Sequence, residues 1–244
     1  MSFTNPGAYA TRTSLIGFTE KLPADIKAII PQSRIATSTL EYAHSVLPSA
    51  ILNHSLRVYI YAHKIATISN STWSAADKLD LLFAACLFHD SGVCQQHNGE
   101  ERFEIEGADA AAHHLEKHDV SEAAIHEVWV AIALHTSAGI ADRISEMARI
   151  VRTAVLIDFG ELARLSRKVT IAAFGAESPD PAFESFMVEV EKSLPRLEAE
   201  EVLGNAVVEQ AMDEPQKAPA ASWPGCLLRA RIDDPHWTGV NPAF

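Results

Sequence analysis

The feature of this sequence that most constrains its fold is an adjacent His-Asp pair at the end of an apolar run. The run extends from Leu81 to Phe88 and is followed at once by His89 and Asp90. An apolar run of this kind predicts a buried helix. Adjacent residues on a helix point about 100° apart, so both side chains can reach one metal only where the helix stops. Gly92 is a candidate C-cap residue that would stop it.

Two more polar residues fall on the apolar stripes of predicted helices. His54 lies 35 positions before His89 and shares a helical face with apolar neighbours three and four residues away. Asp158 lies 68 positions after Asp90 and shares a face with Ala154. A buried carboxylate destabilises the folded chain unless it is paired or bound to a metal. Asp158 is therefore the residue whose burial most needs an explanation.

His135 also points inward, because it continues a stripe formed by Ile125, Val128 and Ile132. Taken alone, His54 or His135 is compatible with a core histidine that bonds a backbone carbonyl. Two histidines and two acids that all point into a helical bundle are hard to satisfy without a shared ion. Two nitrogen and two oxygen ligands suit Zn²⁺, Fe²⁺ or Mn²⁺. Cores of helical bundles commonly hold such sites.

The hydrophobic periodicity predicts an all-α fold, and no alternating β-branched runs with hairpin turns occur. We expect a single helical domain at 33–211, an N-terminal segment at 1–32, and an irregular C-terminal tail at 212–244 packed on the domain. The predicted helices cover approximately 33–46, 49–69, 74–89, 104–117, 121–136, 142–165 and 182–211.

Composition limits the partners of the protein. The formal net charge of −12 repels phosphate backbones, so no nucleic acid partner is expected. Three cysteines form no disulfide framework and indicate a reducing compartment. No apolar run is long enough to span a membrane, and the first twenty residues lack the apolar core of a signal peptide. We expect a soluble, cytoplasmic protein that takes a small-molecule substrate, and a homo-oligomer is compatible with the sequence.

Several common site motifs are missing. The histidines and acids are too far apart for a zinc finger, and no His-Glu-x-x-His pair occurs. Neither glycine-rich phosphate-loop pattern is present, and there is no Gly-x-Ser-x-Gly elbow. The inward histidines and acids are therefore the main candidates for chemistry.

In the order of these residues, the chain resembles the HD superfamily of metal-dependent hydrolases. The defining order of that superfamily is His, then His-Asp, then a distant Asp, and it is met here by His54, His89-Asp90 and Asp158. The resemblance implies that these four residues bind one divalent metal and that the fold is an HD-type helical bundle. It covers approximately residues 45–165.

Within that superfamily, the chain is most similar to the cyanamide hydratase-like branch. The resemblance rests on the segments Asn53-His54-Ser55-Leu56-Arg57-Val58-Tyr59, Arg102-Phe103-Glu104-Ile105-Glu106-Gly107 and Ala131-Ile132-Ala133-Leu134-His135-Thr136. This branch implies zinc as the metal and hydration of a nitrile-like carbon, such as that of cyanamide, to give urea. Iron and manganese suit the same ligand chemistry.

This interpretation assigns roles to the residues around the metal. Asp90 would bind the metal and accept the water proton, and His135 would act as acid toward the developing nitrogen anion. Arg57, one turn from His54, would orient a ligand carboxylate or form an ordinary ion pair. Phe103 and Glu104 would cap the site, although Glu104 also fits a plain helix N-terminal charge.

Two other functions share the same motifs. A phosphohydrolase would need additional cations near the metal, and only Arg57, Lys64 and Arg102 are available in the motif region. A non-catalytic metal- or ligand-binding module is the other alternative, and the intact ligand set argues against it. His113, His114 and His118 are read either as solvated surface or as part of a second metal site.

Overall fold

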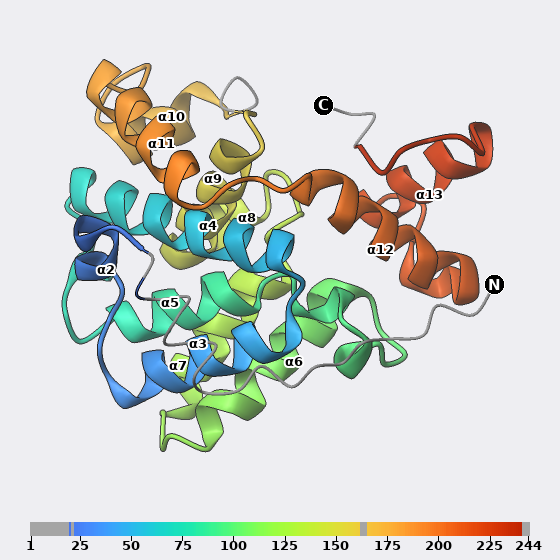
Figure 1. The fold of residues 1–244 in the computed structure, drawn as a ribbon, viewed down its shortest axis with the longest axis horizontal. Coiled ribbons are helices and arrows are strands. Elements are labelled where there is room, and N and C mark those ends of the chain that lie inside the picture. Colours follow the sequence, from blue (N-terminus) through green and yellow to red (C-terminus); the bar gives the residue numbers. More distant parts are fainter. Residues whose placement is uncertain (1–19, 21, 162–164, 241–244) are drawn as a thin grey trace.

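The computed structural model describes residue 20 and residues 22–161 and 165–240. The prediction of an all-α fold is confirmed, because the described residues form helices and no strands (Figure 1). No helix among them is both long and apolar enough to cross a membrane. The α-helices are α2 (Ala24–Ile29), α3 (Arg34–Val46), α4 (Ser49–Ile68), α5 (Leu79–Phe88), α6 (Phe103–Glu116), α7 (Glu122–Ala133), α8 (Ala141–Ile144), α9 (Glu146–Asp158), α10 (Arg167–Phe174), α11 (Pro181–Ser193), α12 (Ala199–Asp213) and α13 (Trp223–Asp233). Short 3₁₀ helices are η1 (Thr72–Ser74), η2 (Ser91–Val93), η3 (Gln95–His97) and η5 (Pro215–Lys217).

Helices α4 and α5 form the centre of the bundle. Helix α4 packs against α5 and α9, and α5 also packs against α3 and α7. Every residue of α4 from Ala50 to Ala62 is buried, as is every residue of α5 from Leu82 to Phe88. A helix stretch that is buried on all sides must be surrounded by other elements of the fold. The packing therefore puts the middle of α4 and the end of α5 in the interior of the molecule.

Two predicted helices break where local signals interrupt them, and a third begins later than predicted. The helix expected at 182–211 is two helices, α11 and α12, because Pro195 and the residue before it cannot continue a helix. The helix expected at 142–165 is divided at Ser145, whose side chain accepts a bond from the Ala148 N–H and begins α9. Helix α9 then ends just before Gly160, whose φ is +80°. The helix expected at 74–89 begins only at Leu79.

The C-terminal tail differs from the prediction of irregular structure, because Trp223–Asp233 form α13. Ser222 caps this helix by accepting a bond from the Gly225 N–H, and Pro224 occupies its first turn. Helix α13 packs against α12, and both lie together at one side of the bundle (Figure 1). The short helices α2 and α10 were also not predicted.

Gly92 does not cap α5 as the sequence suggested. Helix α5 ends at Phe88 with His89 as its C-cap, and Gly92 lies in η2. A Cβ atom at Gly92 would lie 2.0 Å from the carbonyl oxygen of Phe103. Glycine is therefore needed at this position, because a side chain would push apart two backbone segments that touch. Their contact holds the start of α6 against the turn that follows Asp90.

We predict that Gly92→Ala destabilises the protein by at least about 2 kcal/mol, because a backbone carbonyl cannot move aside. Gly175→Ala is the control: its φ is +69°, but its Cβ would meet no atom within 4 Å, so we expect a cost of about 1 kcal/mol. Urea unfolding followed by circular dichroism measures both. Equal stability of the two variants would contradict the close approach at Gly92.

Candidate metal centre

Three buried residues from α4 and the end of α5 offer metal ligands close together. One ligand atom from each of His54, His89 and Asp90 lies within 4.8 Å of the others. His54 is in the middle of α4, and His89 and Asp90 follow the last residue of α5. Because α5 stops there, the two adjacent side chains converge on one point instead of diverging around a helix.

The protonation of two rings follows from their partners. Nδ1 of His89 lies 2.7 Å from the carbonyl oxygen of Cys86, and Nδ1 of His135 lies 2.7 Å from that of Ile132. A carbonyl oxygen only accepts, so we assign the proton of each neutral ring to Nδ1. Each Nε2 therefore carries a lone pair, which is the form that binds a metal.

His54 is oriented by a buried ion pair. Its Nδ1 lies 2.6 Å from Oδ2 of Asp158, and Arg57 donates to both oxygens of that carboxylate at 2.6 and 2.8 Å. Burial alone would raise the pKa of Asp158, but its bonds with His54 and Arg57 lower it to about 2. The ionised carboxylate holds a proton on Nδ1 of His54 and turns its Nε2 toward His89.

The atoms at the centre of the cluster lack partners of the right kind. The Nε2 atoms of His54 and His89 are 3.1 Å apart, and two lone pairs at that distance repel unless a cation or proton lies between them. Burial lowers the pKa of His54, but its contacts with Asp158 and Asp90 outweigh burial and raise it. Positive charge at this Nε2 is thus favoured.

Asp90 shows the same need for a cation. Neither of its carboxylate oxygens has a hydrogen-bond partner among the described residues. Nε2 atoms of His54, His89 and His135 lie 3.3, 3.1 and 3.5 Å from it. Burial would raise the pKa of Asp90, but these histidines hold it well below its usual range. Imidazole nitrogens facing a buried carboxylate are the ligand set of Zn²⁺, Fe²⁺ or Mn²⁺, so the residues present fit a divalent metal.

Asp158 lies behind this group instead of within it. Both of its oxygens face Arg57 and Nδ1 of His54, and it is not among the three residues that converge. In this arrangement it would act on a bound metal through His54, as a carboxylate that orients a ligand histidine does. Arg57 has the position expected for it beside that carboxylate. Direct ligation by Asp158 stays a prediction.

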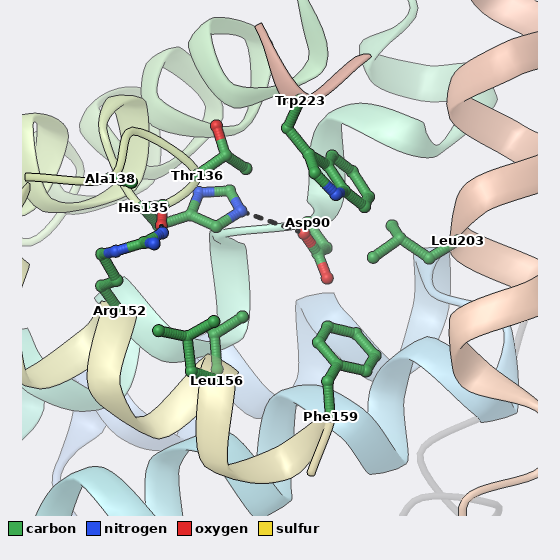
Figure 2. A pocket seen from close by; sticks show the side chains of 10 residues that line it. Asp90, His135, Thr136, Ala138, Arg152, Leu156, Phe159, Leu203 and Trp223 are labelled. Carbon is green, nitrogen blue, oxygen red and sulfur yellow. Dashed lines mark hydrogen bonds and ion pairs between the residues drawn. The ribbon is translucent and has the colours of Figure 1, made fainter. Parts of the chain in front are cut away.

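A cavity of about 140 Å³ opens beside Asp90 and His135 (Figure 2). Its polar lining residues are Asp90, His135, Thr136 and Arg152. Its apolar lining residues are Ala138, Val155, Leu156, Phe159, Leu203 and Trp223. The three candidate metal ligands, His54, His89 and Asp90, are called the metal cluster below. Through Asp90 this cluster borders a small space that is polar at one end and apolar over the rest.

Of the predicted site residues, only Asp90 and His135 line this cavity, and the three predicted to contact the substrate or support the metal ligands do not. Arg57 is fully buried beside Asp158, and the ring of Phe103 packs edge-on against His135 at a centroid distance of 5.7 Å. Glu104 is also fully buried, and it accepts bonds from Arg102 and, at 2.6 Å, from the hydroxyl of Thr136. Glu104 thus positions a cavity residue, which a plain helix N-terminal charge would not do.

Arg152 is a cavity residue that the sequence analysis missed. It donates to the carbonyl oxygen of His135 at 2.9 Å and lies 3.5 Å from a carboxylate oxygen of Asp142. Residues 152, 155, 156 and 159 share one helical face, which is a local signal. That face lies about 120° from Asp158 around the helix, so it is not the stripe that carries Asp158. Trp223 gives no such local signal, because only the packing of α13 brings it to the site.

The histidines at the end of α6 have partners other than a metal. The Nε2 atoms of His114 and His118 lie 3.1 and 2.7 Å from the hydroxyl of Ser38, and His113 is exposed next to Glu116. In the described part of the chain, the group of His54, His89 and Asp90 is the one set that could hold a metal. The structure thus favours the surface interpretation of the α6 histidines.

Comparison with known families agrees with this geometry. Residues 51–157 match the HD domain family, a range that is somewhat less than half of the chain. The range contains His54, His89, Asp90 and His135 but ends one residue before Asp158, and it excludes α12 and α13. The comparison with curated proteins gave no match. HD domains are generally metal-dependent hydrolases, so the match supports water chemistry at a divalent metal.

We predict that chelator-treated protein binds one Zn²⁺ per chain and is stabilised by about 2.7 kcal/mol at a hundredfold excess over the dissociation constant. His89→Ala should lose this binding because it removes a converging Nε2. The exposed His126 provides the control variant, His126→Ala, which should bind zinc as the wild type does. Calorimetric titration and thermal unfolding measure both effects. Wild-type zinc affinity in His89→Ala would disprove the site.

We predict that Asp158→Asn keeps the fold and binds zinc about 10–100 times more weakly. The amide oxygen can still accept from Arg57, but it no longer holds a proton firmly on Nδ1 of His54. The same titration measures the change. Unaltered affinity would show that Asp158 has no part in the site, whereas a loss as complete as in His89→Ala would make it a direct ligand.

Proposed function

We propose that this protein is a metal-dependent hydratase that adds water to a small, uncharged nitrile-like carbon, such as that of cyanamide, and so forms urea. The HD domain supports water chemistry at a divalent metal. Zinc is the metal we propose, because histidine and carboxylate ligands suit it, as they also suit iron and manganese.

The observation that carries the proposal is the size of the cavity beside Asp90 and His135. Its volume is about 140 Å³, and a dry cavity of about 150 Å³ holds one benzene molecule. Cyanamide is smaller than benzene, and a nucleotide is several times larger. The space therefore suits a substrate of a few atoms.

The charge of the lining also favours a neutral substrate. Arg152 is the one cationic side chain that lines the cavity in the described part of the chain, and it already contacts Asp142 and the His135 carbonyl. Phosphoryl transfer usually requires several cations around the phosphate. Because Arg152 is present, hydrolysis of a small phosphate ester is the second candidate function.

The residues present can hold the metal and move the proton that the reaction displaces. A divalent metal held by His54, His89 and Asp90 would lower the pKa of a bound water toward about 7. Asp90 accepts the proton that water loses as its oxygen bonds to the nitrile carbon. One C–N π electron pair then moves onto the nitrogen, which requires a proton.

His135 is placed to return that proton. Its Nε2 lies 3.5 Å from Oδ1 of Asp90, and both residues line the cavity. The proton passes from Asp90 to Nε2 of His135 and then to the substrate nitrogen. Throughout, the Nδ1–H of the ring stays bonded to the Ile132 carbonyl. The product isourea tautomerises to urea, so atoms and charge balance.

We predict that His135→Asn keeps its fold and its metal but hydrates cyanamide about 10²–10⁴ times more slowly, since proton transfer contributes that much to a rate. Turnover is measured as urea formation, alongside metal content and circular dichroism. His126→Ala, at an exposed position of α7, the helix that ends two residues before His135, serves as the control. Near-normal turnover in metal-loaded His135→Asn would reduce His135 to a packing residue.

One assay separates the two candidate functions. The metal-loaded protein is incubated with cyanamide and with a panel of phosphate esters, each with and without chelator. Chelator-sensitive formation of urea supports the hydratase. Chelator-sensitive release of phosphate, with no hydration of cyanamide, would replace it with the phosphohydrolase.

A further inference from the structure

Besides Phe159, which lies just past the end of the match, two residues of the cavity wall come from outside the region that matches the HD domain. Leu203 belongs to α12 and Trp223 begins α13, whereas the match ends at residue 157. In Figure 2 both side chains stand on one side of Asp90, and Leu156 and Arg152 lie on the other. The metal cluster and this part of the wall are therefore supplied by different segments of the chain.

The indole of Trp223 has a defined position. It packs against Phe103 with ring centroids 5.8 Å apart, and Phe103 in turn packs edge-on against His135. The backbone beside it is held by the Ser222 cap and by Pro224 in the first turn of α13. The indole thus packs against Phe103 and its backbone is fixed by the helix cap, so Trp223 forms a defined part of the wall.

The segment that carries this wall is anchored to the turn beside the metal cluster. The side chain of Gln210, in α12, donates to the carbonyl oxygen of Gly92 at 2.9 Å. The ammonium group of Lys217 is buried and lies 2.5 Å from the side-chain oxygen of Asn98. Both bonds reach the loop that follows Asp90, so α12 and α13 are positioned relative to the candidate metal ligands.

We infer that Trp223, supported by Leu203, sets the upper size of the substrate by closing the apolar end of the cavity. The polar end, with Asp90 and His135, is where the reacting group binds, so any substituent on that group points toward the apolar wall. The substrate class is then an unsubstituted or very short nitrile-like molecule. This inference rests on the proposed function for its substrate class, but the wall itself is a feature of the cavity.

The inference is tested with Trp223→Ala, Trp223→Phe and the control Trp237→Ala. Trp237 lies in the same C-terminal segment, where it packs against Arg231 and donates to the Val240 carbonyl, and it does not line the cavity. Binding of 2-naphthol, an aromatic probe larger than benzene, is measured by calorimetry on metal-free protein. The kcat/KM values for phenylcyanamide and cyanamide are measured on metal-loaded protein.

We expect Trp223→Ala to bind 2-naphthol at least about tenfold more tightly than the wild type, and to shift the phenylcyanamide-to-cyanamide ratio by at least about tenfold. Trp223→Phe should fall between them, and Trp237→Ala should match the wild type. Unchanged binding in Trp223→Ala, or the same change in Trp237→Ala, would overturn the inference. If Trp223→Ala does not fold, Trp223→Leu takes its place in the same comparison.

The two proposals fail separately in this experiment. If Trp223→Ala gains 2-naphthol binding while no variant hydrates either nitrile, the hydratase proposal is contradicted, but the size limit set by Trp223 is supported. If the wild type hydrates cyanamide while removal of the indole changes neither 2-naphthol binding nor the phenylcyanamide-to-cyanamide ratio, the hydratase proposal is supported, but the size limit set by Trp223 is contradicted.

Discussion

The candidate site depends on the buried ion pair between Arg57 and Asp158. The guanidinium of Arg57 also donates to the carbonyl oxygens of Leu194 and Pro195 at 3.0 and 3.1 Å, so α4, α9 and the turn between α11 and α12 meet on one cation. Removing one member of such a pair costs about 3–5 kcal/mol, because the other charge is left buried and unpaired. The same carboxylate orients His54, so the geometry of the metal cluster follows from the packing of these helices.

Much of the interior could be predicted from the sequence because its signals are local. The stripe that carries His54 follows from helical periodicity, and the end of the apolar run before His89 follows from the same pattern. His135 is buried as predicted, but α7 ends at Ala133 and His135 lies in the turn after it, not in the helix predicted at 121–136. The convergence of these residues was inferred because buried polar groups require a shared partner. The division of 182–211 into two helices was also signalled locally, by Pro195, and was overlooked.

The remainder could not be predicted because it depends on contacts between distant segments. The carboxylate oxygens of Asp158 face Arg57, which lies 101 positions earlier in the sequence. The periodicity of α9 indicates that Asp158 is buried, but it does not indicate whether its partner is an arginine or a metal. Trp223 reaches the cavity through the packing of α13 on α12, and Gln210 and Lys217 tie this segment to the loop after Asp90. Glycine is needed at position 92 because the backbone of Phe103 lies against it. A pattern of residue types does not show such a contact.

The division of the cavity between two segments has a consequence for how such proteins diversify. Mutations in α12 and α13 can alter the wall at Leu203 and Trp223 while His54, His89 and Asp90 remain untouched. Selectivity and metal chemistry can thus evolve as separate traits. Two proteins with the same HD domain and unlike C-terminal helices would therefore be expected to act on different molecules, and grafting one such helical pair onto another protein is a route to new selectivity.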